Sequence, residues 1–600
     1  MPSPGRIAMK RLLACAALAA LACAAAAPAA DSGSTDADAR FHALYQQEWE
    51  WRLQQFPTLA DSVGDHRYGD RLPDESAQNQ QARLAYWDDV LRRLRAIDPK
   101  ALSVDEQVNY AVYRAQIENL VADQRFRQYE MPFNSDSAFW SDLGFMPRDQ
   151  KLDDAADYRA YIARLRAVPK YFDDEIANMR AGLARGFTVP RAVLGGRDVS
   201  IANVAELKHA EDSTFYAPFK KMPARIPAAE QAALRAAGAQ AIREAVIPAY
   251  ARLLRFFRED YVPRARKTLA AEALPDGKAY YRQQIREYTT LDLAPDAIHE
   301  IGLDEVARIH AEMLQTMREA GFTGTFPEFL AFLRSDPQFY ARTPDELLMR
   351  AAWIAKRVDG QLGKFFGLLP RRRFDIEPVP ADIAPFWTSG RGGPDTYWVN
   401  TYDLKSRPLY NLPALTLHES APGHSLQIAL AEEQHEQPAF RRYGYISAFG
   451  EGWALYSEDL GNEMGIYTTP YERFGQLTYA MWRACRLVVD TGVHHLGWTR
   501  ERAIAYLRDN TALSEHEVET EVDRYISWPG QALSYKLGEL KILELRRKAE
   551  AALGPKFDLR AFHDTVLSMG SVPLPLLEQR IDRFIADGGK PPAPACACAR

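Results

Sequence analysis

Two histidines and a glutamate lie close together in the segment Thr416-Leu-His-Glu-Ser-Ala-Pro-Gly-His-Ser-Leu-Gln427. In the motif His-Glu-x-x-His, two histidines on one helix face bind zinc and the glutamate activates water. Here His418 and His424 are six residues apart, which leaves them about 120° apart on a regular helix of about 3.6 residues per turn. Both rings can reach one ion only if the helix is distorted between them.

Pro422 and Gly423 lie between the two histidines and can provide this distortion. Proline removes a main-chain hydrogen bond and clashes with the preceding turn, and glycine adopts dihedral angles that other residues avoid. A bulge or kink there would let both rings converge. The alternative is that Ala421-Pro-Gly ends one helix and His424 begins another, with no metal.

A second segment, Gly450-Glu-Gly-Trp-Ala-Leu-Tyr-Ser-Glu-Asp459, favours a metal site. Glu451 and Glu458 are seven residues apart and therefore share one face of a helix. A catalytic zinc takes three protein ligands and leaves one position open, so we predict Glu451 as the third ligand. Glu458 or Asp459 would accept a hydrogen bond from a ligating imidazole. A solvated acidic face is the alternative, but the apolar residues between the acids favour burial.

The remaining candidates would act on the substrate. We predict that Glu419 takes a proton from the attacking water and passes it to the leaving amine. The charge that develops on the substrate's carbonyl oxygen needs a hydrogen-bond donor. Tyr535 is the first candidate for this donor, and His494, Tyr397 and Arg524 are further candidates for catalysis or substrate binding. Tyr535 could instead only close a helix contact, and Arg524 could pair with a carboxylate.

Helical periodicity dominates the sequence that must position these residues. Apolar residues three and four apart predict helices over 38–55, 76–97, 104–125, 155–180 and 295–317. The best short strand, 396–401, comes just before the histidine segment. We therefore predict a mainly α protein, one large helical body with a small β-sheet near the active site. Residues 30–285 would form a lid or channel wall, residues 286–588 the catalytic region, and residues 589–600 a disordered tail.

Composition excludes several classes of protein. Of 600 residues, 47% are hydrophobic and 26% charged, which is typical of a globular chain. The net charge of −6 is spread along the sequence, so a nucleic-acid partner is not expected.

The first 29 residues have the pattern of a secretory signal peptide. Arg6, Lys10 and Arg11 precede an apolar run, and Ala27-Pro-Ala offers a cleavage site. The alternative is a lipid anchor at Cys23, in a sequence that loosely resembles a lipobox. No later stretch is apolar enough to span a bilayer, so we expect a periplasmic or extracellular protein.

The motifs His-Glu-x-x-Pro-Gly-His-x-x-Gln and Glu-Gly-Trp-Ala-Leu-Tyr-x-Glu resemble those of a widespread bacterial family catalogued as a domain of unknown function. That family is commonly grouped with helical, zincin-like metallopeptidases. The resemblance covers nearly the whole chain after the leader, with further matching segments at 301–309, 489–498 and 528–536. The spacing of the two glutamates is also similar to the glutamate helix of oligopeptidases and carboxypeptidases of the thimet and thermostable-carboxypeptidase types. Those enzymes have His-Glu-x-x-His, so this chain departs from them by two residues.

These observations predict a secreted zinc-dependent peptidase. It would hydrolyse peptide bonds of short peptides with metal-activated water, with Zn²⁺ as the cofactor. One alternative is a zinc-dependent amidase or esterase that acts on non-peptide substrates. The other is a catalytically inactive binding protein, although such a protein has no need of Glu419 beside His418.

Overall fold

The computed structural model describes residues 36–381 and 384–591. The predicted signal peptide with Cys23, and residues 592–600 of the predicted tail, lie outside the described residues. The mainly α class is confirmed, and the predicted helices agree with the structure to within a few residues. For example, the periodicity over 295–317 corresponds to helix α14, Pro295–Glu319.

The N-terminal half of the described chain is entirely helical apart from turns and loops. Its helices are α1 (Asp36–Gln55), α2 (Pro57–Ser62), α3 (Ala77–Arg95), α4 (Val104–Phe126), α5 (Phe139–Asp142), α6 (Met146–Asp149), α7 (Ala155–Arg185), α8 (Asp198–Ala205), α9 (Ala217–Lys220), α10 (Ala228–Ala241), α11 (Ile247–Phe256), α12 (Val262–Arg264) and α13 (Gly277–Thr289). The predicted division at residue 285 falls inside α13.

The C-terminal half carries the histidine and glutamate motifs. Its helices are α14, α15 (Phe326–Ser335), α16 (Pro344–Phe365), α17 (Leu412–Glu419), α18 (His424–Glu432), α19 (Ala439–Arg442), α20 (Ser447–Glu463), α21 (Pro470–His494), α22 (Arg500–Asn510), α23 (Glu515–Ser527), α24 (Ser534–Leu553), α25 (Leu559–Leu567) and α26 (Leu574–Ala586). In the described chain, no helix is both long and apolar enough to cross a membrane.

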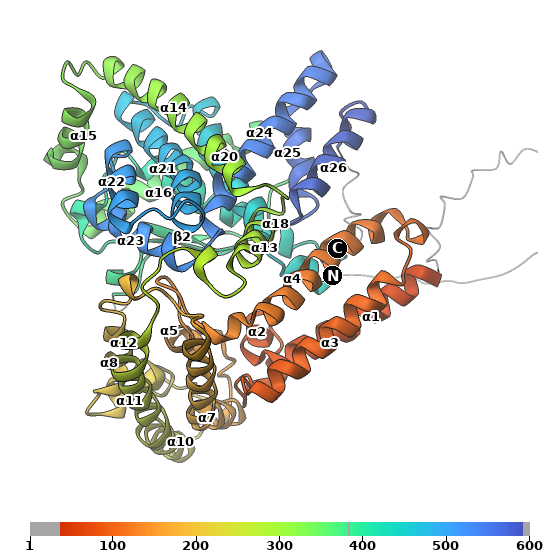
Figure 1. Ribbon diagram of the computed structural model, residues 1–600, viewed down its shortest axis with the longest axis vertical. Coiled ribbons are helices and arrows are strands. Elements are labelled where there is room, and N and C mark those ends of the chain that lie inside the picture. The colour runs from red at the N-terminus through yellow and green to blue at the C-terminus, as the bar shows by residue number, and fades with distance from the viewer. Residues whose placement is uncertain (1–35, 382–383, 592–600) are drawn as a thin grey trace, which may run out of the picture.

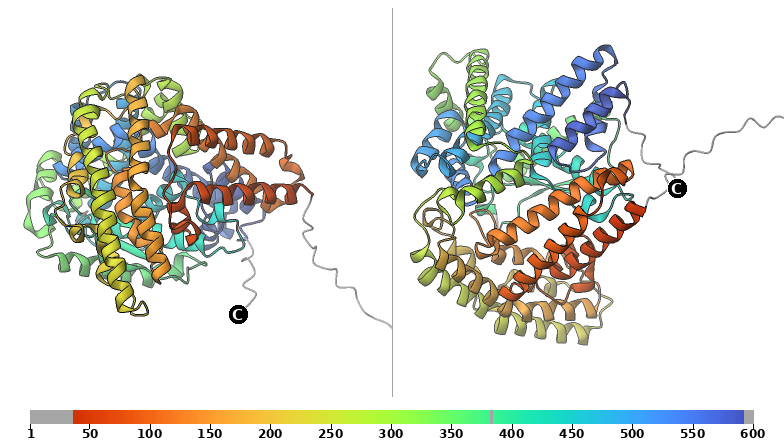
Figure 2. Two further views of the ribbon diagram at one scale, coloured as in Figure 1. Left: turned by 90° about the horizontal axis from the view of Figure 1, so that it is seen from below. Right: turned by 45° about the vertical axis from the view of Figure 1, so that its right-hand side comes forward.

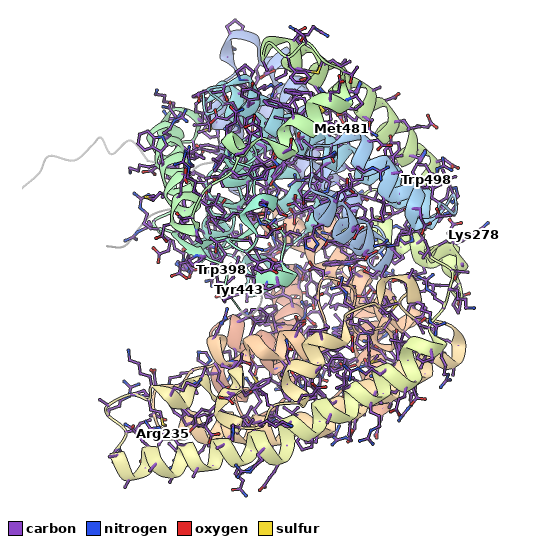
Figure 3. All side chains as sticks on the ribbon, turned by 90° about the vertical axis from the view of Figure 1, so that its left-hand side faces the viewer. Arg235, Lys278, Trp398, Tyr443, Met481 and Trp498 are labelled. Atoms are coloured by element: carbon purple, nitrogen blue, oxygen red, sulfur yellow. The ribbon has the colours of Figure 1, made fainter. Side chains whose placement is uncertain are left out.

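The two halves lie one above the other. Helices α1 to α12 occupy the lower part of Figure 1 and α14 to α26 the upper part, and the right-hand view of Figure 2 shows the two sets facing each other. Figure 3 shows Trp398 and Tyr443 on the side of the upper part that faces the lower helices. One continuous hydrophobic core includes residues of both halves, so they form one body.

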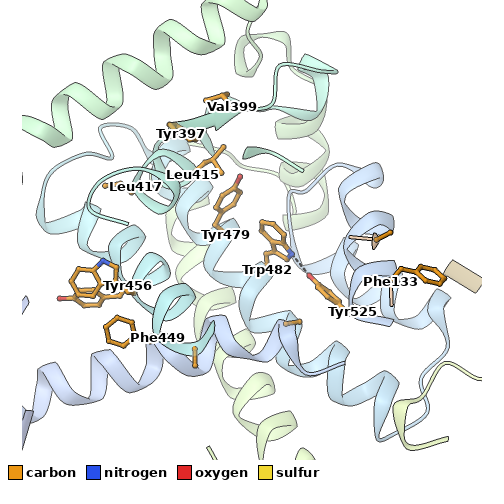
Figure 4. Packing of buried hydrophobic residues seen from close by; sticks show 14 of the residues in the cluster. Phe133, Tyr397, Val399, Leu415, Leu417, Phe449, Tyr456, Tyr479, Trp482 and Tyr525 are labelled. Carbon is orange, nitrogen blue, oxygen red and sulfur yellow. Dashed lines mark hydrogen bonds between the residues drawn. The ribbon is translucent and has the colours of Figure 1, made fainter. Parts of the chain in front are cut away.

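A three-stranded sheet covers α17. Its strands are β1 (Asp375–Pro378), β2 (Gly390–Gly392) and β3 (Thr396–Val399), in the order β1-β3-β2. Strand β3 is parallel to β1 and antiparallel to β2, with Gly392 opposite Tyr397. The buried side chains of Tyr397 and Val399 face Leu415 and Leu417 of α17 in the core (Figure 4). The sheet thereby fixes the helix that carries His418 and leaves β2 as an edge strand.

Helices α20 and α24 cross at two glycines, which allows their backbones to approach closely. A Cβ atom on Gly538 would lie 2.0 Å from the carbonyl oxygen of Ala448 and 2.8 Å from the Cα atom of Gly452. Any other residue at position 538 would push the helices apart. This crossing brings the helix of Glu451 next to the helix of Tyr535.

Candidate metal centre

The two histidines lie on separate helices. Helix α17 ends at Glu419 and α18 begins at His424, so the distortion predicted at Pro422 is a complete break rather than a bulge. The amide of Gly423 donates a hydrogen bond to the carbonyl oxygen of Leu417 at 3.0 Å, which folds the chain back on α17. The rings of His418 and His424 consequently lie 4.9 Å apart, centre to centre. The break therefore brings the rings together instead of separating them.

Glu451 completes a cluster of three possible ligands. Its Oε2 atom lies 3.4 Å from Nε2 of His418 and 3.3 Å from Nε2 of His424. These distances match a tetrahedral zinc site, in which two ligand atoms that each lie about 2.1 Å from the ion are about 3.4 Å apart. Within the described residues, these three form the one group of His, Cys, Asp or Glu side chains that could hold a metal ion.

The state of the buried polar atoms agrees with a cation at this point. Glu451 Oε2, the oxygen that faces both imidazoles, is buried and has no hydrogen-bond partner among the described residues. Buried polar atoms in native proteins are nearly always paired, and an exception calls for an explanation such as an ion. Two imidazoles and one carboxylate are a usual ligand set for catalytic zinc, so the residues fit the predicted metal.

Glu458 orients His418 by contacting the ring nitrogen that does not face Glu451. Its Oε1 atom lies 2.7 Å from Nδ1 of His418, so a proton on Nδ1 is shared with the carboxylate and Nε2 is left to face Glu451. Arg483 lies 3.5 Å from the same oxygen. Of the two acids predicted for this role, Glu458 is therefore the one in contact, whereas Asp459 accepts a hydrogen bond from Asn462 on its own helix.

The electrostatics of the cluster favour positive charge. Burial by itself would lower the pKa of His418, but the carboxylates of Glu451 and Glu458 outweigh it and raise the pKa to about 9. Burial would likewise raise the pKa of Glu451, yet His424 and His418 hold it well below its ordinary value. A buried site that stabilises a cation on its own imidazole is suited to a divalent metal.

Glu419 lies where the sheet meets the histidines. One of its carboxylate oxygens accepts a hydrogen bond from the main-chain amide of Gly392 at 2.6 Å. The side chain is only partly buried, and its second oxygen has no hydrogen-bond partner among the described residues. This main-chain donor on β2 has no signature in the sequence, because any residue other than proline carries an amide.

Tyr535 and Arg524 lie beside the cluster, in contact with each other. The ring of Tyr535 is nearly parallel to that of His418, 6.4 Å away, and only 6% of the residue is exposed. Its hydroxyl accepts hydrogen bonds from Arg524 at 3.1 Å and from Gln531 at 3.4 Å. Arg524 was expected to touch the substrate, and in the structure it contacts Tyr535.

Two predicted site residues have structural roles instead. His494 is fully buried and bonded through both ring nitrogens, accepting from the amide of Ala271 and donating to the carbonyl oxygen of Tyr525. Burial lowers its pKa to about 3. Tyr397 is also fully buried, with its hydroxyl 3.4 Å from Thr416. Neither side chain offers an atom to a substrate.

Tyr445 is a further candidate for the site that the sequence alone did not indicate. Its ring lies 6.5 Å from that of His424. Half of its surface is exposed, but its hydroxyl lies close to Gly450, the residue before Glu451, where an added Cβ atom would lie 2.5 Å from the hydroxyl oxygen. Burial and the nearby carboxylate together raise its pKa well above the ordinary value. The sequence feature that could have indicated it is Tyr-Gly-Tyr, residues 443–445, just before the helix of Glu451.

Comparison with known proteins gives a family without a stated activity. The family described as "Bacterial protein of unknown function (DUF885)" matches residues 57–581. The crystal structure of a candidate lipoprotein from Colwellia psychrerythraea is 29% identical, with a TM-score of 0.86 over 92% of this chain and 100% of that chain. A candidate lipoprotein of unknown function from Shewanella oneidensis has the same fold at 19% identity, with a TM-score of 0.67 over 91% of this chain and 99% of that chain. No curated protein matches the chain.

Proposed function

Because this chain belongs to the bacterial family of unknown function DUF885, we propose its activity from the site alone: it is a zinc-dependent peptidase that hydrolyses short peptides. The observation that carries this proposal is the convergence of His418, His424 and Glu451, with the buried Oε2 atom of Glu451 left without a hydrogen-bond partner among the described residues. When bound there, zinc supplies a Lewis acid that lowers the pKa of water towards about 7.

The residues around the cluster support peptide hydrolysis as the proposed reaction. The water oxygen bonds to the carbonyl carbon, the carbon–nitrogen bond breaks, and a proton moves from the water to the leaving amine. Glu419 carries that proton, since the amide of Gly392 holds one of its oxygens and no hydrogen bond within the described residues engages the other. Tyr535 or Tyr445 donates a hydrogen bond to the carbonyl oxygen as charge develops on it.

The surroundings of the cluster favour a peptide as the substrate. Strand β2 is one of the two edge strands of the sheet and lies beside Glu419, and an edge strand can bind an extended peptide through main-chain hydrogen bonds. The histidines are at most 7% exposed, which restricts access and favours short chains.

We further propose that the protein is exported. The two structural relatives are named as candidate lipoproteins, and the sequence offers Cys23 as a lipid attachment site after an apolar run. Mass analysis of the N-terminus from native membranes would show a lipidated Cys23 or cleavage after Ala29. An intact Met1 would exclude both.

The decisive experiment is metal analysis of the wild type beside two variants of α20. Glu451→Gln removes a ligand, and Glu463→Gln is the matched control because that carboxylate pairs with Arg546 at the surface. We expect about one zinc per chain in the wild type and the control, and loss of zinc in Glu451→Gln. No zinc in any protein after zinc is supplied would refute the proposal.

Activity assays then separate peptidase from the alternatives. A zinc-loaded peptidase cleaves members of a short-peptide library, and Glu419→Gln keeps zinc but loses cleavage. Hydrolysis of simple esters without any peptide cleavage would indicate the amidase or esterase. Zinc binding with no hydrolysis of either class would indicate a binding protein.

A further inference from the structure

Two hydrogen-bond donors contact the hydroxyl group of Tyr535. Arg524 donates through Nη2 and Gln531 through Nε2. A guanidinium has no acceptor, and an amide nitrogen only donates. The phenol oxygen therefore accepts both bonds, and its own proton must be given to another group.

The position of the ring determines where this proton can go. Tyr535 lies parallel to His418, and the guanidinium of Arg486 lies 4.1 Å from the centre of the ring. In the described part of the chain, no group accepts a hydrogen bond from the Tyr535 hydroxyl. The acceptor is therefore to be sought in the space beside the metal cluster.

We propose that Arg524 and Gln531 are positioning residues, which hold the Tyr535 hydroxyl so that its proton is directed at the carbonyl oxygen of the bound substrate. This inference rests on the proposed function and goes further, since it names how the donor is oriented. A cation that donates to the phenol oxygen also polarises its O–H bond, which strengthens the bond that the hydroxyl gives.

Arg524 is itself held in place. Its Nη1 atom lies 3.5 Å from Oε1 of Glu521, one turn earlier on α23, and its guanidinium faces the ring of Trp528 at 5.6 Å. Glu521 is fixed in turn by Arg486 at 2.8 Å. Only 16% of the Arg524 side chain is exposed. The network fixes the arginine before any substrate arrives, as positioning requires.

A double-mutant cycle on the zinc-loaded protein tests the inference. Tyr535→Phe should lower kcat about 100-fold, as removal of one such donor does elsewhere. Arg524→Gln should lower kcat about tenfold with KM changed less than about twofold, because orientation alone is impaired. The double variant should be no slower than Tyr535→Phe alone. Arg500→Gln is the control, since it breaks another arginine contact of α23, with Asp523, and should leave kcat unchanged.

Additive losses in the double variant would overturn the proposal, because Arg524 would then act without Tyr535. A rise in KM as large as the fall in kcat would also overturn it, since that result indicates direct binding of substrate. Lysine at 524 keeps the charge but loses the fork of donors, and we expect it to restore only part of the rate.

A second measurement does not depend on activity. In metal-free protein labelled with fluorotyrosine, the ¹⁹F resonance of residue 535 is identified by its loss in Tyr535→Phe. It should shift in Arg524→Gln and stay in place in Arg500→Gln. An unmoved resonance in Arg524→Gln would refute the contact itself. Absence of zinc from the wild type would instead refute the proposed function, so the two failures are distinguishable.

Discussion

Gly423 is the position at which one added methyl group should most disturb the geometry of the proposed metal site. A Cβ atom there would lie 1.9 Å from the carbonyl oxygen of His418 and 2.4 Å from that of Leu417. Gly423→Ala would therefore place its methyl group in a steric clash with the main chain of α17.

The magnitude follows from these distances. The Cβ atom needs at least about 3 Å from a carbonyl oxygen, so the turn must open by about 1 Å. Both blocking atoms belong to the main chain of α17 and cannot rotate away, which places the destabilisation at the upper end for overpacked sites, about 3 kcal/mol. Metal ligands tolerate errors of about 0.2 Å. His424 follows the turn directly, so we expect zinc affinity to fall at least about tenfold.

The assay combines thermal unfolding with a zinc titration against a competing chelator. Gly360→Ala is the matched control, because Gly360 lies within α16 and a Cβ atom there would meet nothing within 4 Å. That control should unfold at a slightly higher temperature, since alanine favours a helix over glycine by about 1 kcal/mol. If Gly423→Ala binds zinc and unfolds like the wild type, the close approach does not position His424 and the reasoning fails.

Three further predictions concern neighbouring residues. Glu458→Gln should weaken zinc binding about 10–100-fold in the same titration, because a hydrogen-bonded partner of a ligand is lost; unchanged affinity would contradict the role of Glu458. Tyr445→Phe should lower kcat about tenfold in a peptide assay while zinc content stays constant, and an unaltered rate would leave Tyr535 as the sole donor. Burial raises the pKa of Asp490 to about 7, against hydrogen bonds from Tyr281 and Gly530, from an ordinary value of 3.8. Between pH 3.8 and about 7 the folded state therefore binds one proton more than the unfolded state. The free energy of unfolding should fall as pH rises through this window, by up to about 1.4 kcal/mol per pH unit. Asp490→Asn should remove this contribution from the pH dependence of the unfolding temperature, measured from pH 5 to 8.

The parts of the molecule that local sequence determines were predictable. Helix α14 follows from the spacing of its apolar residues, and α16 begins at a cap typical of helix starts, with Thr343 accepting a hydrogen bond from the amide of Glu346. The shared face of Glu451 and Glu458 follows from helix geometry in the same way. In these cases the relevant atoms are separated by a few residues, so chain geometry fixes their relation.

The site's long-range contacts could not be predicted in this way. His494 lies on a helix rich in apolar residues, as a catalytic histidine could, and its partners Ala271 and Tyr525 are 223 and 31 residues away. Gly392 is 27 residues before Glu419 and donates through its main chain. A sequence shows which side chains can do chemistry, but a core histidine and a catalytic one differ only in what the fold places around them.

The glycines of the two motifs are as much a part of the site as the acids and histidines. Gly423 lets the chain reverse between the histidines, and Gly452, which follows Glu451, faces Gly538 where α20 crosses α24. Tyr535 lies three residues before Gly538 on α24, so the close crossing sets the separation between the proposed metal ligand Glu451 and the proposed donor. A larger residue at either glycine of the crossing would move Tyr535 away from the cluster without touching a ligand. The sequence Glu-Gly-Trp is therefore best understood as a proposed ligand followed by the contact that positions it.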